Sequence, residues 1–209
     1  MLLFLPGLIC DARIYAPQLA AFPESRAVDG YGQVDTLEGM ARVALEVFRL
    51  APNRVRRIAL ASTGVHSIGE GEPAKRRALQ AIGHDDGFAA LVGTWLPPMV
   101  AAHNRSKPIY GAMRQMCLDA GQDVFDAQID AQLTRPEQES LLAQIRCPAL
   151  VMTGALDAWS PPAQHEAIAG RIADSTLVIV PGAGHMLPLE APETVNRAIA
   201  AWLSRPAND

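Results

Sequence analysis

The stretch ALVMTGALDAWSPPAQHEAIAGRIADSTLVIVPGAGH, residues 149–185, decides the fold class of this chain. Two apolar runs of strand length, 149–154 and 176–182, stand on either side of a helical pattern at 162–173. Neither run alternates apolar with polar residues, which predicts strands that are covered on both faces. A strand, a helix and a second strand in this order form a crossover connection, so the stretch predicts a parallel sheet.

The same alternation of strands and helices extends over most of the chain. Further runs of strand length lie at 2–5 and 56–62, with a weaker one at 26–29, and further helical patterns lie at 16–22, 36–51 and 192–203. The sequence therefore predicts an α/β fold, in which a mostly parallel sheet is flanked by helices.

The interval 66–145 breaks this alternation, because it contains several helical segments and no good strand. A long insertion of this kind predicts a helical cap packed over the ends of the strands. The chain has 209 residues, of which 49% are hydrophobic, and this size fits one domain with an ample core. We therefore expect a single domain over 1–209 with a helical cap at about 66–145.

The charge of the chain argues against two classes of partner. The net charge is -4 at pH 7, and the densest basic stretch, EPAKRRALQ at 72–80, is typical of the solvated face of a short helix. Nucleic acids and anionic membrane surfaces both require clustered positive charge. We therefore expect neither of them as a partner, and a small molecule instead.

The cysteines and the first residues bear on the compartment. Three widely spaced cysteines, Cys10, Cys117 and Cys147, fit reduced thiols in a cytoplasmic protein better than disulfides or a zinc site. The opening MLLFLPGL lacks a basic start and is too short for a signal peptide or a membrane span.

We expect no metal and no cofactor. Four histidines lack the spacing of metal ligands and are expected on the surface or on helices: His66, His84, His103 and His165.

Candidate catalytic residues follow the predicted strands, where parallel sheets collect their ligand-binding and catalytic groups. Asp157 comes three residues after Gly154, and His185 comes at the corresponding place after the next strand. After the run at 2–5, Gly7 permits a tight turn whose following backbone N–H groups can face a ligand. An acid that holds an imidazole in one tautomer makes it a general base, so Asp157 and His185 predict hydrolytic chemistry.

Four stretches resemble the α/β-hydrolase fold superfamily. The oxyanion loop of this superfamily is similar to FLPGLICDARIYAPQLAAF, and its acid loop is similar to ALVMTGALDAWSPP. Its histidine loop and last helix are similar to VIVPGAGHMLPLEAPETVNRAIAAWL. The helix and strand that follow its nucleophile are similar to RVALEVFRLAPNRVRRIALASTGVH. The resemblance implies that Asp157 is the acid of a catalytic triad and His185 its base. It also implies that the backbone N–H of Leu8, next to Gly7, is one oxyanion donor.

The chain departs from this superfamily at the nucleophile. Its members carry a serine in G-x-S-x-G on a strained turn after the central strand, and this chain contains no such motif. The family pattern puts Glu38 at the position of the serine, and the preceding GYGQVDTL contains no apolar strand. We interpret this as the loss of the central strand, its elbow and part of a helix. With strands about 4.8 Å apart, the loss either leaves a gap near 10 Å or makes the former neighbours pair directly.

Three residues are candidates for a substitute nucleophile. Ser62 ends a strand and has Gly64 two residues later, as in the elbow, but a polar residue that turns the chain into the cap has the same pattern. Glu38 could attack as a carboxylate, or it is an exposed helix residue. Cys10 lies beside the oxyanion loop, but a buried, apolar-like cysteine is the alternative. We expect any residual covalent chemistry to use Ser62.

Three functional hypotheses follow. The first is a hydrolase of esters or related acyl compounds that uses the Asp157–His185 pair and the oxyanion loop. The second is a catalytically inactive relative whose pocket still binds a small molecule. The third is a shortened chain that folds poorly. We adopt the hydrolase assignment as a statement of lineage, and we expect very low activity on short activated esters because the nucleophile motif is missing.

Overall fold

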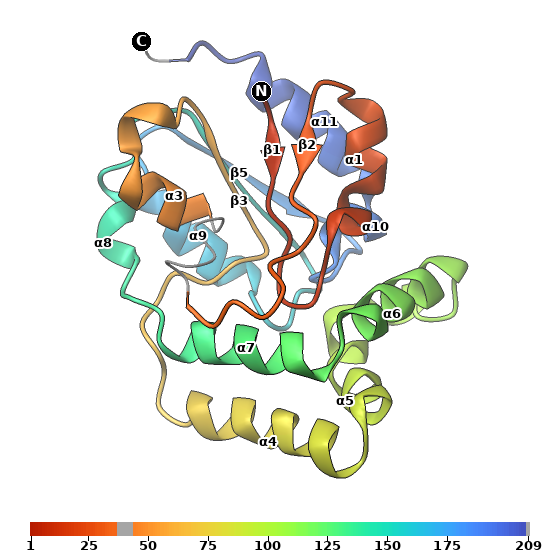
Figure 1. Ribbon diagram of the computed structural model, residues 1–209. Coiled ribbons are helices and arrows are strands. Elements are labelled where there is room, and N and C mark those ends of the chain that lie inside the picture. The colour runs from red at the N-terminus through yellow and green to blue at the C-terminus, as the bar shows by residue number, and fades with distance from the viewer. Residues whose placement is uncertain (37–43, 208–209) are drawn as a thin grey trace.

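A computed structural model describes residues 1–36 and 44–207, and in it parallel strands are flanked by helices, as the sequence predicts (Figure 1). The strands are β1 (Leu3–Phe4), β2 (Arg26–Ala27), β3 (Ile58–Ala61), β4 (Ala149–Gly154) and β5 (Ser175–Val180). The α-helices are α1 (Ala16–Ala21), α3 (Ala44–Leu50), α4 (Glu72–Asp85), α5 (Phe88–Trp95), α6 (Pro108–Ala120), α7 (Gln122–Leu133), α8 (Glu139–Leu142), α9 (Pro162–Gly170), α10 (Leu187–Glu190) and α11 (Pro192–Leu203). Short 3-10 helices are η1 (Ala12–Tyr15), η2 (Pro52–Arg54), η3 (Pro97–Met99) and η4 (Ala102–Asn104).

The described strands form two groups. β1 pairs with β2, and β3, β4 and β5 pair in that order, with Ile58 opposite Ala149 and Ala149 opposite Ser175. Among the described strands, no ladder of backbone hydrogen bonds joins β1 to β3. Direct pairing of β1 with β3, one of the two arrangements that we expected, is therefore not seen among the described strands. Glu38 and the first part of the helix predicted at 36–51 lie outside the described residues, and α3 is the part of that helix that the structure describes.

Strand β4 is the centre of the core, because all six of its residues are buried. Its side chains alternate between two hydrophobic clusters. Leu150 and Met152 pack with Phe4 of β1 and with Trp202 of α11. The alternate residues of β4 pack in a second cluster with side chains of α3 and α9. Both faces of β4 are therefore covered, as predicted, and side chains connect the β1–β2 group to the three-stranded group.

The elements described between β3 and β4 are all helical, in agreement with the absence of a predicted strand there. Helices α4, α5, α6 and α7 lie together beyond one end of the strands (Figure 1). Trp95, Met113 and Phe125 from three of these helices form one buried cluster with Ile9 and Cys10 from the loop after β1. This cluster joins the helical layer to the loop in which we expect the oxyanion donors.

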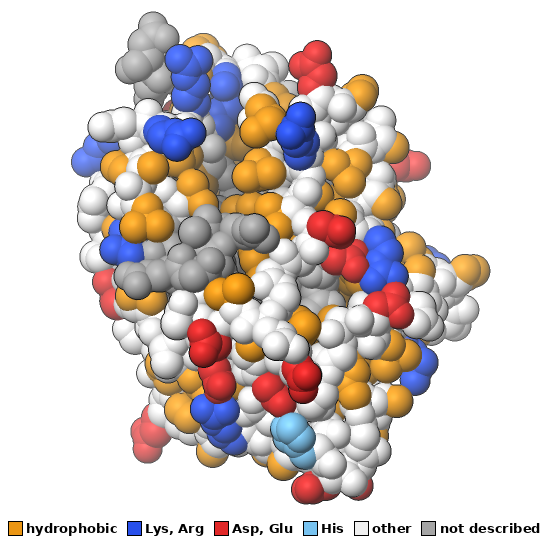
Figure 2. Space-filling model, in the orientation of Figure 1, with side chains coloured by type: hydrophobic (Ala, Val, Ile, Leu, Met, Phe, Trp, Pro, Cys, Tyr) orange, Lys and Arg blue, Asp and Glu red, His pale blue; other side chains and the backbone are white. Residues whose placement is uncertain are grey.

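Charged side chains are unevenly distributed over the surface. On the face shown in Figure 2, most Lys and Arg side chains lie in the upper half and most acidic side chains in the lower half. In residues 1–36 and 44–207, no helix combines the length and the apolar character needed to cross a membrane.

Candidate active site

Asp157 is held by the turn that follows β4. Its backbone N–H donates to the carbonyl oxygen of Gly154 at 3.1 Å. Its Oδ1 accepts hydrogen bonds from the backbone N–H groups of Trp159 at 2.9 Å and Ser160 at 2.8 Å, and the Thr153 hydroxyl donates to Oδ2 at 3.2 Å. The residue is only 3% exposed. The carboxylate is therefore fixed in a buried position by its own loop.

His185 is positioned by the loop after β5, and glycines let this loop pack closely. The backbone N–H of His185 donates to the carbonyl oxygen of Met99 at 2.8 Å. A Cβ at Gly184 would lie 2.7 Å from the same oxygen, and a Cβ at Gly154 would lie 2.2 Å from the carbonyl oxygen of Ala183. Real Cβ contacts are essentially never this short. The acid loop therefore approaches the histidine loop only because residue 154 is glycine, and the histidine loop approaches Met99 only because residue 184 is glycine.

The two side chains meet as the sequence predicts. His185 Nδ1 lies 2.9 Å from Oδ2 and 3.1 Å from Oδ1 of Asp157. A carboxylate only accepts hydrogen bonds, so Nδ1 carries a hydrogen, and in the neutral imidazole Nε2 is then the nitrogen with the lone pair. The His185 side chain is 24% exposed, whereas that of Asp157 is fully buried, and no described residue bonds to Nε2. Nε2 can therefore take a proton from a hydroxyl group or a water molecule.

The electrostatics keep Asp157 ionised. Burial alone would raise its pKa, but the hydrogen bond and the charge of His185, followed by the N–H of Ser160, hold the pKa below its ordinary value. An ionised carboxylate stabilises the imidazolium that forms when His185 accepts a proton.

The loop after β1 contains Leu8, whose backbone N–H we predict to be an oxyanion donor. The N–H of Cys10 donates to the carbonyl oxygen of Gly7 at 3.1 Å, which closes a turn. The positive φ in this turn, 46°, falls on Ile9 and not on Gly7. The N–H of Ile9 donates to Oε1 of Gln128 on α7 at 2.7 Å. Within the described residues no acceptor bonds the N–H of Leu8, which leaves it available to a ligand.

Ser62 follows β3 in a strained conformation. Its φ of 45° lies in the left-handed region, which costs a non-glycine residue about 1–3 kcal/mol. Two side chains of α9 hold the next residue: Thr63 donates its N–H to Nε2 of His165 at 3.2 Å, and its carbonyl oxygen accepts from Nε2 of Gln164 at 2.8 Å. Helix α9 therefore fixes the turn at Ser62.

The hydroxyl of Ser62 lies near the carboxylate of Asp157. Its Oγ is buried and makes no hydrogen bond of normal geometry with the described residues. It is still among the groups that lower the pKa of Asp157. A nucleophile must reach the substrate, so Ser62 would have to become more exposed to attack one. Its role as a nucleophile stays a prediction.

The lineage follows from a comparison with known families. The model described as "Alpha/beta hydrolase family" matches residues 2–198. The chain belongs to the alpha/beta hydrolase family. Its place there agrees with the resemblance seen in the sequence and with the order of strands, acid loop and histidine loop in the structure.

Solved structures of other proteins resemble this alpha/beta hydrolase over nearly its whole length. A thermophilic esterase from Thermogutta terrifontis is 27% identical, with a TM-score of 0.88 over 97% of this chain and 88% of that chain. The enol-lactonase from Burkholderia xenovorans LB400 is 20% identical, with a TM-score of 0.82 over 98% of this chain and 91% of that chain. At this identity, the second likeness is one of fold alone.

A curated relative matches only in part. The (E)-2-((N-methylformamido)methylene)succinate hydrolase of Acinetobacter baylyi is 39% identical over 61 residues, which are 29% of this chain and 23% of that protein. The match thus spans less than a quarter of the relative.

Cys10 and Glu38 are the other two candidate nucleophiles of this alpha/beta hydrolase. Cys10 is buried, and its hydrogen bond with Cys117 and its burial raise the pKa of its thiol well above the ordinary value. The thiol therefore stays protonated, which argues against its use as a nucleophile. Glu38 lies outside the described residues.

Three residues of the site region have no signal in the sequence. Gln128, Gln164 and His165 bond to backbone groups that are 119, 101 and 102 residues away. We expected His165 on the surface or on a helix, and it lies on α9 with no exposed surface. No local spacing predicts contacts over such distances in the chain.

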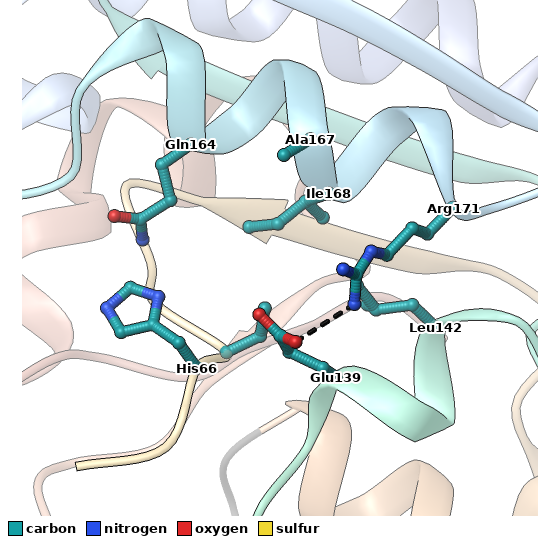
Figure 3. A pocket seen from close by; sticks show the side chains of 8 residues that line it. His66, Glu139, Leu142, Gln164, Ala167, Ile168 and Arg171 are labelled. Carbon is teal, nitrogen blue, oxygen red and sulfur yellow. Dashed lines mark hydrogen bonds and ion pairs between the residues drawn. The ribbon is translucent and has the colours of Figure 1, made fainter. Parts of the chain in front are cut away.

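A small cavity lies between α8 and α9. Its volume is about 120 Å³, and its lining includes His66, Gln164 and the ion pair of Glu139 with Arg171 at 2.9 Å. Figure 3 shows the side chains of His66 and Gln164 facing each other at its edge. Small-molecule sites usually have volumes of about 300–1,000 Å³, so this cavity is too small for an acyl substrate.

Possible metal ligands are dispersed in the part of the chain that the structure describes. No three His, Cys, Asp or Glu residues there are grouped so that they could hold a metal ion.

Proposed function

We propose that this alpha/beta hydrolase cleaves small esters or related acyl compounds, with His185 as the general base. The observation that carries the proposal is the hydrogen bond between Nδ1 of His185 and the buried carboxylate of Asp157. The free N–H of Leu8, next to Gly7, supports the assignment of the oxyanion donor. The likeness to the Thermogutta terrifontis esterase supports an ester substrate.

The proposed reaction uses water, because the sequence contains no G-x-S-x-G and the hydroxyl of Ser62 is buried. A water molecule gives a proton to Nε2 of His185 while its oxygen forms a bond to the carbonyl carbon of the substrate. The carbonyl oxygen becomes an oxyanion that the N–H of Leu8 stabilises. The bond to the alcohol then breaks, and the alcohol takes the proton from Nε2. The products are a carboxylic acid and an alcohol, and His185 is again neutral.

A second candidate function is a binding scaffold without catalysis. The missing G-x-S-x-G motif favours it, because the family's usual nucleophile has no counterpart in this sequence. In that case the protein binds a small molecule without cleaving it, and the Asp157–His185 pair is a remnant of the lineage.

Hydrolysis of 4-nitrophenyl acetate separates the two candidates. We expect turnover well below the enzyme median of about 10 per second, and at least a tenfold loss in His185→Ala. His84→Ala is the matched control, because it removes an exposed imidazole on α4 that is not part of the candidate site. Equal rates in the wild type and both variants would contradict the proposed hydrolase and favour the scaffold.

We also propose that the protein works in the cytoplasm. The support is chemical, since the buried residues Cys10, Cys117 and Cys147 take part in no disulfide among the described residues.

A further inference from the structure

A cavity of about 330 Å³ opens where the loops after β1 and β2 meet α6 and α7. This volume lies at the lower end of the range of small-molecule sites, about 300–1,000 Å³. Neither Asp157 nor His185 lines the cavity. It is therefore separate from the candidate catalytic pair, although its lining begins at Ile9, directly after Leu8.

The charged side chains of the cavity are mostly acidic. Asp11, Asp29 and Asp119 line it together with a single cation, Arg13. Arg13 is already shared, since its guanidinium lies 2.6 Å from Asp11 and 2.6 Å from Asp119. Asp29 is exposed and makes no hydrogen bond or ion pair with any described residue. Three carboxylates against one guanidinium leave two negative charges, one of them on an unpartnered group.

The view in Figure 2 agrees with this distribution. To the right of the centre of the face, acidic side chains lie next to basic ones. An anionic ligand would be repelled there, and a cationic ligand attracted.

Gln128 supplies a second, independent sign of a ligand. Its Oε1 accepts the N–H of Ile9, because a backbone N–H can only donate, so the other end of the side chain is the amide N–H2 group. Gln128 is 2% exposed, lines the cavity, and no described residue accepts a hydrogen bond from its amide nitrogen. This nitrogen is not among the fully buried polar atoms that lack a partner, so it keeps some exposed surface, and an acceptor on an occupant of the cavity can reach it.

We propose that this cavity binds a small organic ammonium compound that also carries a carbonyl oxygen. The ammonium group pairs with Asp29 at the exposed side, and the carbonyl accepts from the amide of Gln128 in the interior. Ile9 and Val124 provide an apolar wall for the body of the ligand. The proposal does not depend on hydrolysis, so it stands or falls separately from the proposed function.

Valinamide and 3-methylbutanamide form a matched pair of probes, since they differ only in the amino group. Each is titrated into the ¹⁵N-labelled full-length protein, at low ionic strength and at a pH at which valinamide is protonated. We expect both probes to shift the side-chain amide resonances of Gln128, and valinamide to bind about fivefold more tightly, as one charge pair near a surface allows. His185→Ala should bind both probes as the wild type does.

Two charge variants test the assignment of the cation site. Asp29→Asn should remove the preference for valinamide, whereas Asp35→Asn, which removes an exposed carboxylate outside the cavity lining, should leave the preference unchanged. Equal affinities of the two probes for the wild type would overturn the proposal. So would an unchanged preference in Asp29→Asn, or unchanged Gln128 side-chain resonances at saturation.

Discussion

The backbone N–H of Ile9 donates to the side-chain oxygen of Gln128 at 2.7 Å, across 119 residues of sequence. Both residues are buried, and Ile9 has a positive φ of 46°. One hydrogen bond from α7 therefore stabilises the strained residue that follows Leu8. The geometry of the oxyanion loop thus depends on a helix that the sequence assigns to the cap.

Gln128→Leu should destabilise the protein, because it leaves the N–H of Ile9 buried without an acceptor. We expect a loss of about 1–3 kcal/mol in the free energy of unfolding, measured by urea denaturation. Gln132→Leu is the control, since Gln132 lies on the same helix and makes no described side-chain hydrogen bond. Its effect should stay within about 0.5 kcal/mol. Similar losses in both variants would show that the Ile9 hydrogen bond is not the cause.

Gly154→Ala should separate the acid loop from the histidine loop. The new Cβ would lie 2.2 Å from the carbonyl oxygen of Ala183, so backbone atoms must move. We expect a loss of at least about 2 kcal/mol in thermal or urea unfolding. Gly93→Ala on α5 has no atom within 4 Å of the new Cβ and should instead stabilise the protein by about 0.5–1 kcal/mol. A neutral Gly154→Ala would disprove the close approach of the two loops.

Glu72→Gln should cost stability in a pH-dependent way. Its bidentate hydrogen bonds with Arg135, against the opposing effect of burial, lower the pKa of Glu72 to about 2, from about 4.3 in an unfolded chain. A depressed pKa gives stability that is complete above the unfolded value and is lost as the pH falls through the folded value. We expect the variant to be less stable by about 1–2 kcal/mol at pH 7, and this difference to vanish as the pH falls towards about 2.

The control for this measurement is an exposed ion pair. Glu139→Gln removes the partner of Arg171, whose side chain is 53% exposed, and should change stability little at any pH. A difference between Glu72→Gln and the wild type that does not depend on pH would rule out the charge of Glu72 as the source of the effect.

Ser62 is the residue that we predict to form any covalent adduct. A fluorophosphonate probe should label it slowly, because its Oγ is buried, and the label should be absent in Ser62→Ala. Mass spectrometry of peptides identifies the modified residue. An adduct on another serine that persists in Ser62→Ala would eliminate Ser62 as the substitute nucleophile.

The sequence predicts closely the C-terminal part of the fold and the proximity of Asp157 and His185. The run at 149–154 is β4 to the residue, and the helix at 192–203 is α11. Both elements can be recognised in the sequence, because the apolar residues of each follow one regular pattern and glycine or proline stands at its boundary. Asp157 and His185 are also predictable, since loops at the same end of adjacent parallel strands converge.

The N-terminal part and the supporting contacts are harder to predict. The runs at 2–5 and 26–29 become β1 and β2 with only two residues each, because the length of a strand depends on its partner. The contacts of Gln128, Gln164 and His165 are single side-chain hydrogen bonds to distant backbone groups. Such contacts depend on tertiary geometry and leave no periodic pattern in the chain.

The division of the strands has a consequence for folding. A pair of two-residue strands is marginal by itself, whereas β3, β4 and β5 are longer and fully laddered, so amide protons of β1 should exchange with solvent faster than those of β4. The loop with Leu8 follows β1, but Asp157 and His185 follow β4 and β5. We therefore expect Leu8 to belong to a less stable part of the fold than Asp157 and His185. The candidate site is then complete only in those molecules in which the β1–β2 pair is formed.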